Sequence, residues 1–181
     1  RKLTHLFRSQ YNALISTSRS INEDNSLLNC RIRGLTHKSP HVIIIDRNLI
    51  LKKNLDIYKT KNKRKIYVIT TKNDKKKIKW LKKNNIKVIK LQKLNSKEDF
   101  NKILKYLMKL KFSRIFVESG LTFMNFLIVN NILNNIYVFK TNFNLKGNGK
   151  NNSSNKLIKK IKLKNKLKVN LGNDNVYFER L

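Results

Sequence analysis

The sequence predicts an α/β fold with three layers, in which helices cover both faces of a mostly parallel sheet that has an antiparallel C-terminal edge. One observation is the alternation of short β-branched runs with helical patterns between residues 42 and 139, which is typical of parallel sheets. The other is the run of four consecutive β-branched residues at 42–45, as expected for a strand buried on both faces. The 181 residues suffice for a sizeable core, so we expect a single domain over residues 1–181.

The first forty residues predict a helix, a strand and a long loop. An apolar stripe with helical spacing lies within residues 1–10, and residues 13–15 indicate a short buried strand. Residues 17–28 are polar and rich in Asn and Ser. We therefore expect a loop there, of the kind that often carries binding residues.

Strands and helices then alternate along the chain. A basic helix is predicted at 74–84, and Ser96 with Asp99 resembles a capping box at the start of the next helix. The buried residues of that second helix are expected to be Phe100, Ile103, Leu104 and Leu107. Further strands are predicted at 66–70, 86–89, 114–118 and 136–139, with a helix at 121–130. Residues 144–155 predict a flexible loop, residues 156–170 alternate Lys with Leu and Ile, and residues 176–181 predict a last strand at the antiparallel edge.

The charge of the chain leaves two interpretations open. The formal net charge is +32, from 42 basic and 10 acidic residues, and clustered Lys and Arg are typical of nucleic-acid binding. Lys, Asn and Ile dominate while Ala, Gly and Pro are scarce, as an AT-rich genome would produce. The excess of Lys is spread along the chain, and this favours codon bias over specific nucleic-acid recognition, which prefers clustered Arg.

Cys30 is the single cysteine, so an intrachain disulfide and a thiolate metal site are excluded. His5, His37 and His41 lack ligand spacing, and we expect no metal and histidines in surface or loop positions. The sequence has neither a signal-peptide pattern nor an apolar run long enough to cross a bilayer, so we expect a soluble, cytoplasmic protein without membrane contact.

Candidate binding residues fall into two distant segments. Glu118 ends a predicted strand and Gly120 opens the next helix, at the sheet edge where α/β proteins bind ligands. Arg8 and Arg31 could clamp a phosphate. The alternatives are a helix-capping role for Glu118 and solvated surface positions for the two arginines. Asp24 is equally compatible with a turn residue. Neither a G-x-G-x-x-G fingerprint nor a P-loop is present.

Several blocks of sequence occur in an order that resembles one enzyme family. They are residues 6–15 (LFRSQYNALI), the series Ser20, Asp24, Leu28 and Arg31, residues 45–49 (IDRNL) and residues 116–120 (FVESG). Together they resemble the reductase domain of the bifunctional riboflavin-biosynthesis deaminase/reductase, whose fold is similar to that of dihydrofolate reductase. The resemblance implies reduction of 5-amino-6-(5-phosphoribosylamino)uracil to its ribitylamino product, with hydride passing from NADPH to the sugar C1.

The resemblance also implies roles for individual residues. The substrate-binding positions would be Arg8, Leu28, Arg31 and Glu118. The cofactor-binding positions would be Ser20, Asp24, Arg47, Gly120, Leu121, Thr122, Phe123, Met124, Asn125 and Phe126. The chain departs from the family at Ser20, where Thr is usual, at 24–26, where Asp-Asp-Pro is usual, at Leu121, where Pro is common, and at 141–147, which lacks an Ala-Pro-Lys-Leu-Leu-Gly run. No catalytic residue is assigned.

Compared with the family, the chain is expected to lack the first strand of the reductase domain and the upstream zinc-binding deaminase domain, and it holds no His/Cys zinc set for deamination. The family is often dimeric, so the resemblance allows a homodimer. Two other functions remain: a reductase of similar fold that acts on a pterin-type substrate, and a basic nucleic-acid-binding module.

Overall fold

The computed structural model describes residues 2–141, 161–169, 171, 172 and 174–181. The chain divides into two compact units, Arg1–Ser119 and Gly120–Leu181, and each is described by itself. The predicted loop at 144–155 lies outside the described residues, as does part of the segment 156–170.

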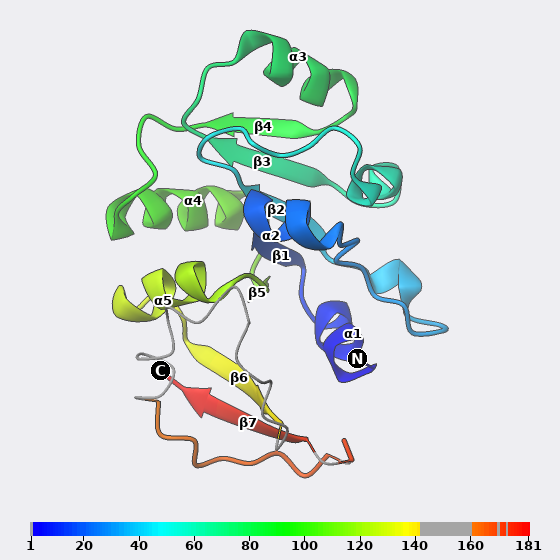
Figure 1. Cartoon of the computed structure of the whole chain (residues 1–181), viewed down its shortest axis with the longest axis vertical. Coiled ribbons are helices and arrows are strands. Elements are labelled where there is room, and N and C mark those ends of the chain that lie inside the picture. Colours follow the sequence, from blue (N-terminus) through cyan, green and yellow to red (C-terminus); the bar gives the residue numbers. More distant parts are fainter. Residues whose placement is uncertain (1, 142–160, 170, 173) are drawn as a thin grey trace. The chain divides into compact units, whose positions relative to one another are not determined.

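A five-stranded parallel sheet forms the centre of the first unit (Figure 1). Its strands follow the order β4-β3-β2-β1-β5, and every neighbouring pair is parallel. Their bounds are β1 Ala13–Thr17, β2 His41–Ile45, β3 Ile66–Thr70, β4 Lys87–Lys90 and β5 Ile115–Val117. All five predicted strands in this unit are confirmed, with ends that differ by one or two residues.

Helices precede and connect these strands. They are α1 Lys2–Ser9, α2 Ser18–Asp24, α3 Lys75–Lys83 and α4 Lys97–Lys109, with short 3-10 helices η1 Thr36–Lys38 and η2 Asp56–Thr60. Asp74 caps α3 and Ser96 caps α4 through their side chains, and the cap at Ser96 was predicted from the sequence. Leu104, in contrast, is only half-buried, so the predicted inward face of α4 consists of its other three apolar residues.

The prediction of a loop over residues 17–28 is wrong for its first half. Residues 18–24 form the helix α2 because Thr17 accepts a hydrogen bond from the backbone N–H of Ser20, and Asn25 ends the helix in a left-handed conformation. Ile21 is fully buried and anchors the helix on the core. Ser20 and Asp24, expected on a loop, therefore lie one helical turn apart on α2.

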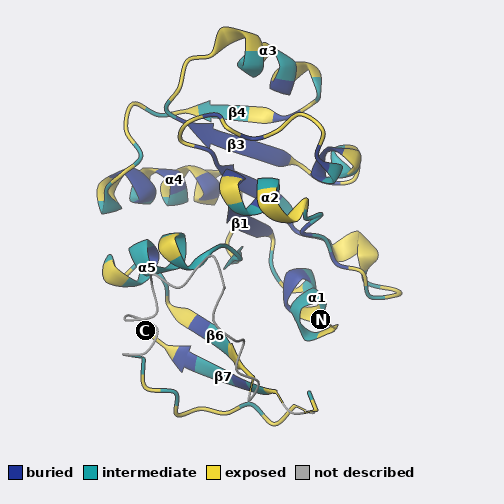
Figure 2. Ribbon diagram, in the orientation of Figure 1, coloured by how far each residue is buried: buried dark blue, intermediate teal, exposed yellow. Residues whose placement is uncertain are grey.

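The core explains the three layers. Alternate residues of a strand point to opposite faces, and the largest buried cluster joins one face of the sheet to α2 and α3. On the other face, Tyr67 packs edge-to-face on Phe112, which follows α4, with ring centroids 5.9 Å apart. Figure 2 shows that β1, β2 and β3 are the most buried strands.

The second unit contains α5 Leu121–Val129 and an antiparallel pair, β6 Asn135–Lys140 with β7 Asn175–Arg180. The helix and both strands were predicted. The antiparallel pairing is confirmed, but β6 and β7 pair with each other in a two-stranded sheet of their own rather than extending the parallel ladder. The buried carboxylate of Glu179 accepts hydrogen bonds from the backbone N–H groups of Lys164 and Asn165 and holds the neighbouring segment to β7.

Candidate active site

Two of the predicted substrate residues, Arg8 and Glu118, bind each other in the first unit. Arg8 lies in the last turn of α1 with 7% of its surface exposed. Its Nε and Nη2 atoms donate to the two carboxylate oxygens of Glu118 at 2.9 and 2.5 Å. Glu118 directly follows β5, and its backbone N–H continues the ladder by donating to the carbonyl of Ile15. The sheet thus aims the carboxylate at the helix, and the pair is bidentate.

The carbonyl oxygen of Asn29 joins two further groups to this pair. It accepts from Arg8 Nη1 and from His5 Nδ1, each at 3.0 Å. Since a carbonyl can only accept, Nδ1 of His5 carries the hydrogen and Nε2 is the acceptor of the neutral ring. The side-chain Oδ1 of Asn29 is buried and has no hydrogen-bond partner in the described part of the chain.

Arg31 belongs to the same neighbourhood. Burial lowers the pKa of His5, and the positive charges of Arg8 and Arg31 lower it further, whereas the charge of Glu118 raises it. All three charged groups therefore act on one imidazole. The side chain of Arg31 is exposed and makes no ion pair within the described residues. No hydrogen bond or ion pair joins Arg31 to Glu118 among the described residues, so their predicted association stays a prediction.

Leu28 contributes to this site through its backbone. Its side chain is 4% exposed and lies in the main hydrophobic cluster. Its φ angle is +51°, in the left-handed region that leucine rarely adopts. The carbonyl of Leu28 accepts from the guanidinium of Arg64, which is itself buried. The side chain of Leu28 is therefore held in the core and its carbonyl is held by Arg64.

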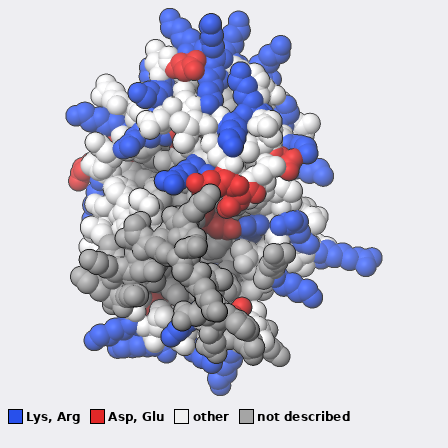
Figure 3. All heavy atoms as spheres, viewed as in Figure 1, with Lys and Arg blue, Asp and Glu red and all other residues white. Residues whose placement is uncertain are grey.

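Positive charge dominates the surroundings. Arg8 and Arg64 are the two buried arginines of the described chain, and Glu118 pairs with one of them only. Elsewhere, exposed lysines cover α3, and Figure 3 shows them projecting at the top of the face in view. A cation-lined site of this kind attracts anionic ligands.

Three residues predicted for the cofactor also lie in the first unit. The hydroxyl groups of Ser20 and Thr17 form a hydrogen bond of 3.0 Å. The Thr17 hydroxyl also accepts from Ser119 Oγ at 3.3 Å. Asp24 is exposed near the end of α2. Arg47 is exposed, and its carbonyl accepts from the backbone N–H of Thr71. The contacts among the described residues do not join these three side chains to one another.

The backbone around Arg47 is fixed by its neighbour Asp46. This carboxylate is 1% exposed and accepts from the backbone N–H groups of Ile50 and Leu51 at 2.8 and 2.9 Å. The turn after β2 is thereby closed, and the side chain of Arg47 projects from it into solvent. Asp46 is a structural residue that the sequence showed only as the end of a strand.

The remaining predicted cofactor residues, 120–126, begin the second unit. Gly120 is the N-cap of α5 and brings no side chain to the N–H groups of the first helical turn. The start of α5 therefore has no side-chain cap. The rings of Phe123 and Phe126 stack at 6.3 Å with an interplanar angle of 14°.

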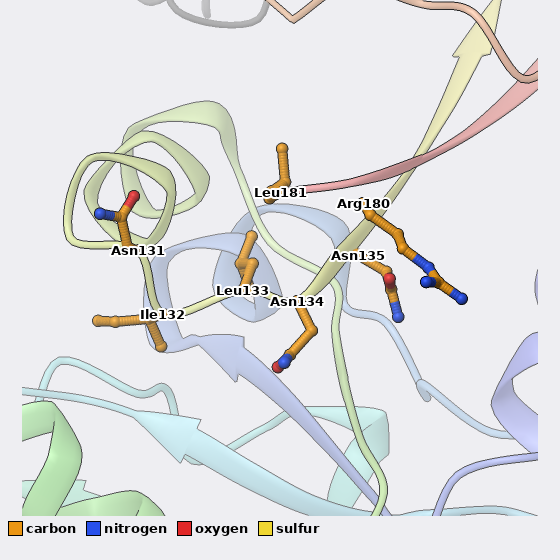
Figure 4. Close-up of a pocket in the computed structure, with 7 residues that line it drawn as sticks. All are labelled: Asn131, Ile132, Leu133, Asn134, Asn135, Arg180 and Leu181. Carbon is orange, nitrogen blue, oxygen red and sulfur yellow. The ribbon is translucent and has the colours of Figure 1, made fainter.

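The second unit also contains a pocket of about 570 Å³ (Figure 4). Its lining residues are Asn131, Ile132, Leu133, Asn134, Asn135, Arg180 and Leu181. Asn135 and Arg180 face each other across β6 and β7, and Figure 4 shows their side chains directed to the same side. None of the predicted site residues lines this pocket.

Sequence reasoning missed three residues of the site: His5, Asn29 and Arg64. The interpretation of His5 as a plain surface or loop residue is incomplete, because its ring is half-buried and bonded to Asn29. The spacing of His5 and Arg8, three residues apart on a helix, was the available signal. For Arg64 there was none, since its partners are backbone carbonyls distant in sequence.

The described residues include neither a metal-binding cluster nor a membrane-spanning helix. They contain no group of three or more His, Cys, Asp or Glu side chains that could hold a metal ion. Across the same part of the chain, none of the helices has the length and apolar character needed to cross a membrane.

Comparison with known proteins identifies a family and a shared fold. A family model described as the RibD C-terminal domain matches residues 1–177. Among solved structures, RibD from Acinetobacter baumannii is 15% identical in sequence with a TM-score of 0.74. The match includes 98% of this chain and 49% of the Acinetobacter chain. A deaminase/5-amino-6-(5-phosphoribosylamino)uracil reductase from Thermotoga maritima is 16% identical with a TM-score of 0.74. The match includes 99% of this chain and 48% of the Thermotoga chain.

The riboflavin biosynthesis reductase Rib7 from Saccharomyces cerevisiae is 21% identical with a TM-score of 0.74, and 98% of this chain covers 78% of that one. The chain therefore spans about half the length of the two bacterial proteins. No curated protein sequence matches it. The structural likenesses confirm the predicted α/β fold.

Proposed function

This chain belongs to the RibD C-terminal domain family, and we propose that it reduces 5-amino-6-(5-phosphoribosylamino)uracil with NADPH in riboflavin biosynthesis. The observation that carries the proposal is the hydrogen-bonded group of Arg8, Glu118, His5 and Asn29, with the exposed Arg31 two residues after Asn29 in the chain. Such a site offers a cation for the phosphate and acceptors for the amino and ring N–H groups of a pyrimidine.

The division of work between the two arginines follows from their contacts. The guanidinium of Arg8 donates to Glu118 and to the carbonyl of Asn29, so the role of Arg8 is to orient the carboxylate. Arg31 is exposed and unpaired among the described residues, so it is the arginine that binds the substrate phosphate. Both were expected to clamp the phosphate together, and we propose instead that Arg31 alone contacts it, because Arg8 is paired with Glu118.

Glu118 holds the polar end of the substrate. Each carboxylate oxygen accepts one N–H from Arg8 and retains a second lone pair. Asn29 Oδ1, buried and without a partner in the described residues, offers one more acceptor. The backbone of Leu28 completes the proposed contacts.

The residues of the first unit fit a nicotinamide cofactor. NADPH, when bound, supplies the hydride that reduces the sugar carbon. Arg47 offers an exposed cation on a fixed turn, which suits the 2′-phosphate that distinguishes NADPH from NADH. Ser20 and Asp24 offer polar groups on one face of α2. In the second unit, the segment 120–126 is proposed separately as a phosphate-binding helix start.

The proposal includes a larger protein. The bacterial chains of similar fold are about twice as long, and the Thermotoga protein is described as a deaminase joined to a reductase. We propose the same arrangement here, with this chain as the single reductase domain, in the cytoplasm, and a homodimer as its assembly.

The experiment measures NADPH oxidation with three compounds: the phosphorylated pyrimidine, its dephosphorylated form and dihydrofolate. We expect turnover with the first, a KM about tenfold or more higher with the second, and none with the third, since a charge-assisted phosphate contact is worth roughly 1.5–3 kcal/mol. Turnover of dihydrofolate alone would identify a pterin reductase instead.

The variant Arg31→Ala tests the phosphate contact. We expect it to raise KM for the phosphorylated compound by about tenfold and to abolish the preference for phosphate. Arg33→Ala is the matched control, because Arg33 is equally exposed two residues away. Equal KM values in the two variants would reject the assignment.

A further inference from the structure

Arg64 is a buried cation without an acidic partner among the described residues. It lies just before β3 and is 4% exposed. Its Nη1 donates to the carbonyls of Leu28 at 2.8 Å and Pro40 at 3.1 Å, and its Nη2 donates to the carbonyl of Leu27. Its Nε donates to Thr60 Oγ1 at 3.1 Å. Burying a charge is costly unless it is compensated, and here the compensation consists of backbone carbonyls and one hydroxyl.

Two of these carbonyls belong to the segment that carries the proposed substrate contacts. Leu28 has its φ angle at +51°, and a non-glycine residue in this region costs roughly 1–3 kcal/mol, so the surroundings must hold it there. The Leu28 side chain is fixed in the core and its carbonyl is fixed by Arg64. The two constraints together define the conformation.

The next residue transmits this conformation to the site. Asn29 directs its carbonyl to both Arg8 and His5, and Arg8 in turn orients Glu118. Arg31 follows two residues later. A continuous series of contacts therefore runs from Arg64 through Leu28 and Asn29 to the carboxylate.

The geometry requires a planar, multidentate cation at this position. Arg64 reaches three carbonyls and a hydroxyl in different directions from one rigid group, whereas a lysine offers donors at a single atom. Burial lowers the pKa of Arg64 to about 10, and the charge of Arg8 adds to the lowering. The guanidinium is still cationic at neutral pH, so it also adds positive charge behind the phosphate-binding segment.

We propose that Arg64 is a positioning residue that holds residues 27–31 in the conformation that binds the substrate. It contacts the backbone of this segment and leaves the direct phosphate contact to Arg31. The inference rests on the proposed function for the identity of the ligand.

The test compares Arg64→Lys and Arg64→Gln with Thr60→Val. The control removes the hydroxyl acceptor of Nε and leaves the three carbonyl contacts in place. Steady-state kinetics give KM and kcat for the phosphorylated pyrimidine, and amide hydrogen exchange follows residues 27–31 against β2 and β3. Arg64→Lys retains the charge and serves if Arg64→Gln fails to fold.

We expect both Arg64 variants to raise KM by about tenfold or more, with kcat changed less than threefold, and to speed exchange within 27–31 but not in the two strands. Thr60→Val should leave both readouts near wild type. Folded variants with wild-type KM, or with slow exchange retained in 27–31, would overturn the inference. Absence of turnover in the wild type would instead refute the proposed function, and the exchange data alone would then decide the role of Arg64.

Discussion

Replacing Glu118 with Gln tests the ion pair at the centre of the site. The substitution keeps the size of the side chain and removes its charge. The amide oxygen can still accept one N–H from Arg8, but the amide NH₂ group faces the other donor. Arg8 keeps its bond to the carbonyl of Asn29, and its charge loses the only carboxylate that it contacts in the described chain.

The expected magnitude follows from burial. Removing one partner of a fully buried ion pair costs roughly 3–5 kcal/mol. The side chain of Arg8 is 9% exposed but that of Glu118 is 32% exposed, so water screens part of the loss. We expect Glu118→Gln to lower the free energy of unfolding by about 2 kcal/mol, within the range for a charged hydrogen bond left unsatisfied.

Urea denaturation at neutral pH measures this loss from the midpoint at constant m. Glu23→Gln is the matched control, because Glu23 pairs with Arg19 on α2 while their side chains are 55% and 76% exposed. Exposed pairs on a helix contribute roughly 0.5 kcal/mol or less. If the two substitutions destabilise the protein equally, the Arg8–Glu118 pair does not have the burial and geometry described above.

The remaining predictions concern pH and salt. Burial lowers the pKa of His41 below 6.5, with Lys65 and Arg64 adding to the effect, and its Nδ1 accepts from the backbone N–H of Lys65. The unfolded chain then binds more protons, so stability should fall as pH drops below about 6.5 and level off below the folded pKa. Thermal unfolding between pH 7.5 and 5 checks this, and an equally steep loss in His41→Asn would contradict it. For the basic surface, we expect binding to duplex DNA at low salt that disappears at physiological ionic strength; persistence there in a fluorescence anisotropy titration would favour the nucleic-acid-binding alternative.

Much of the fold could be predicted because the strands carry strong local signals. The run at 42–45 is buried on both faces, and Ser96 caps α4 at the expected position. The helix α2 was missed because its sequence is polar and only Ile21 is fully buried. The helix is stabilised by the Thr17 cap and by the burial of Ile21, and neither produces a repeating apolar pattern in the sequence.

The sequence suggested candidate residues for the site but not the contacts between them. Arg8 and Glu118 were found from the resemblance and from the position of Glu118 at a strand end. Their pairing depends on the parallel neighbours β1 and β5, in which paired residues such as Ala13 and Ile115 are 102 positions apart in the chain. The contacts of Arg64 are still harder to predict, because three of its partners are backbone carbonyls, which every residue has whatever its type.

Phosphorus NMR of the phosphorylated pyrimidine, titrated with wild-type protein and with Arg31→Ala, tests the central claim most directly. We expect the phosphate resonance to shift on addition of the wild type and of Arg33→Ala, and to remain at its free position with Arg31→Ala. An identical shift with all three proteins would show that the phosphate binds elsewhere and would contradict the assignment of this site.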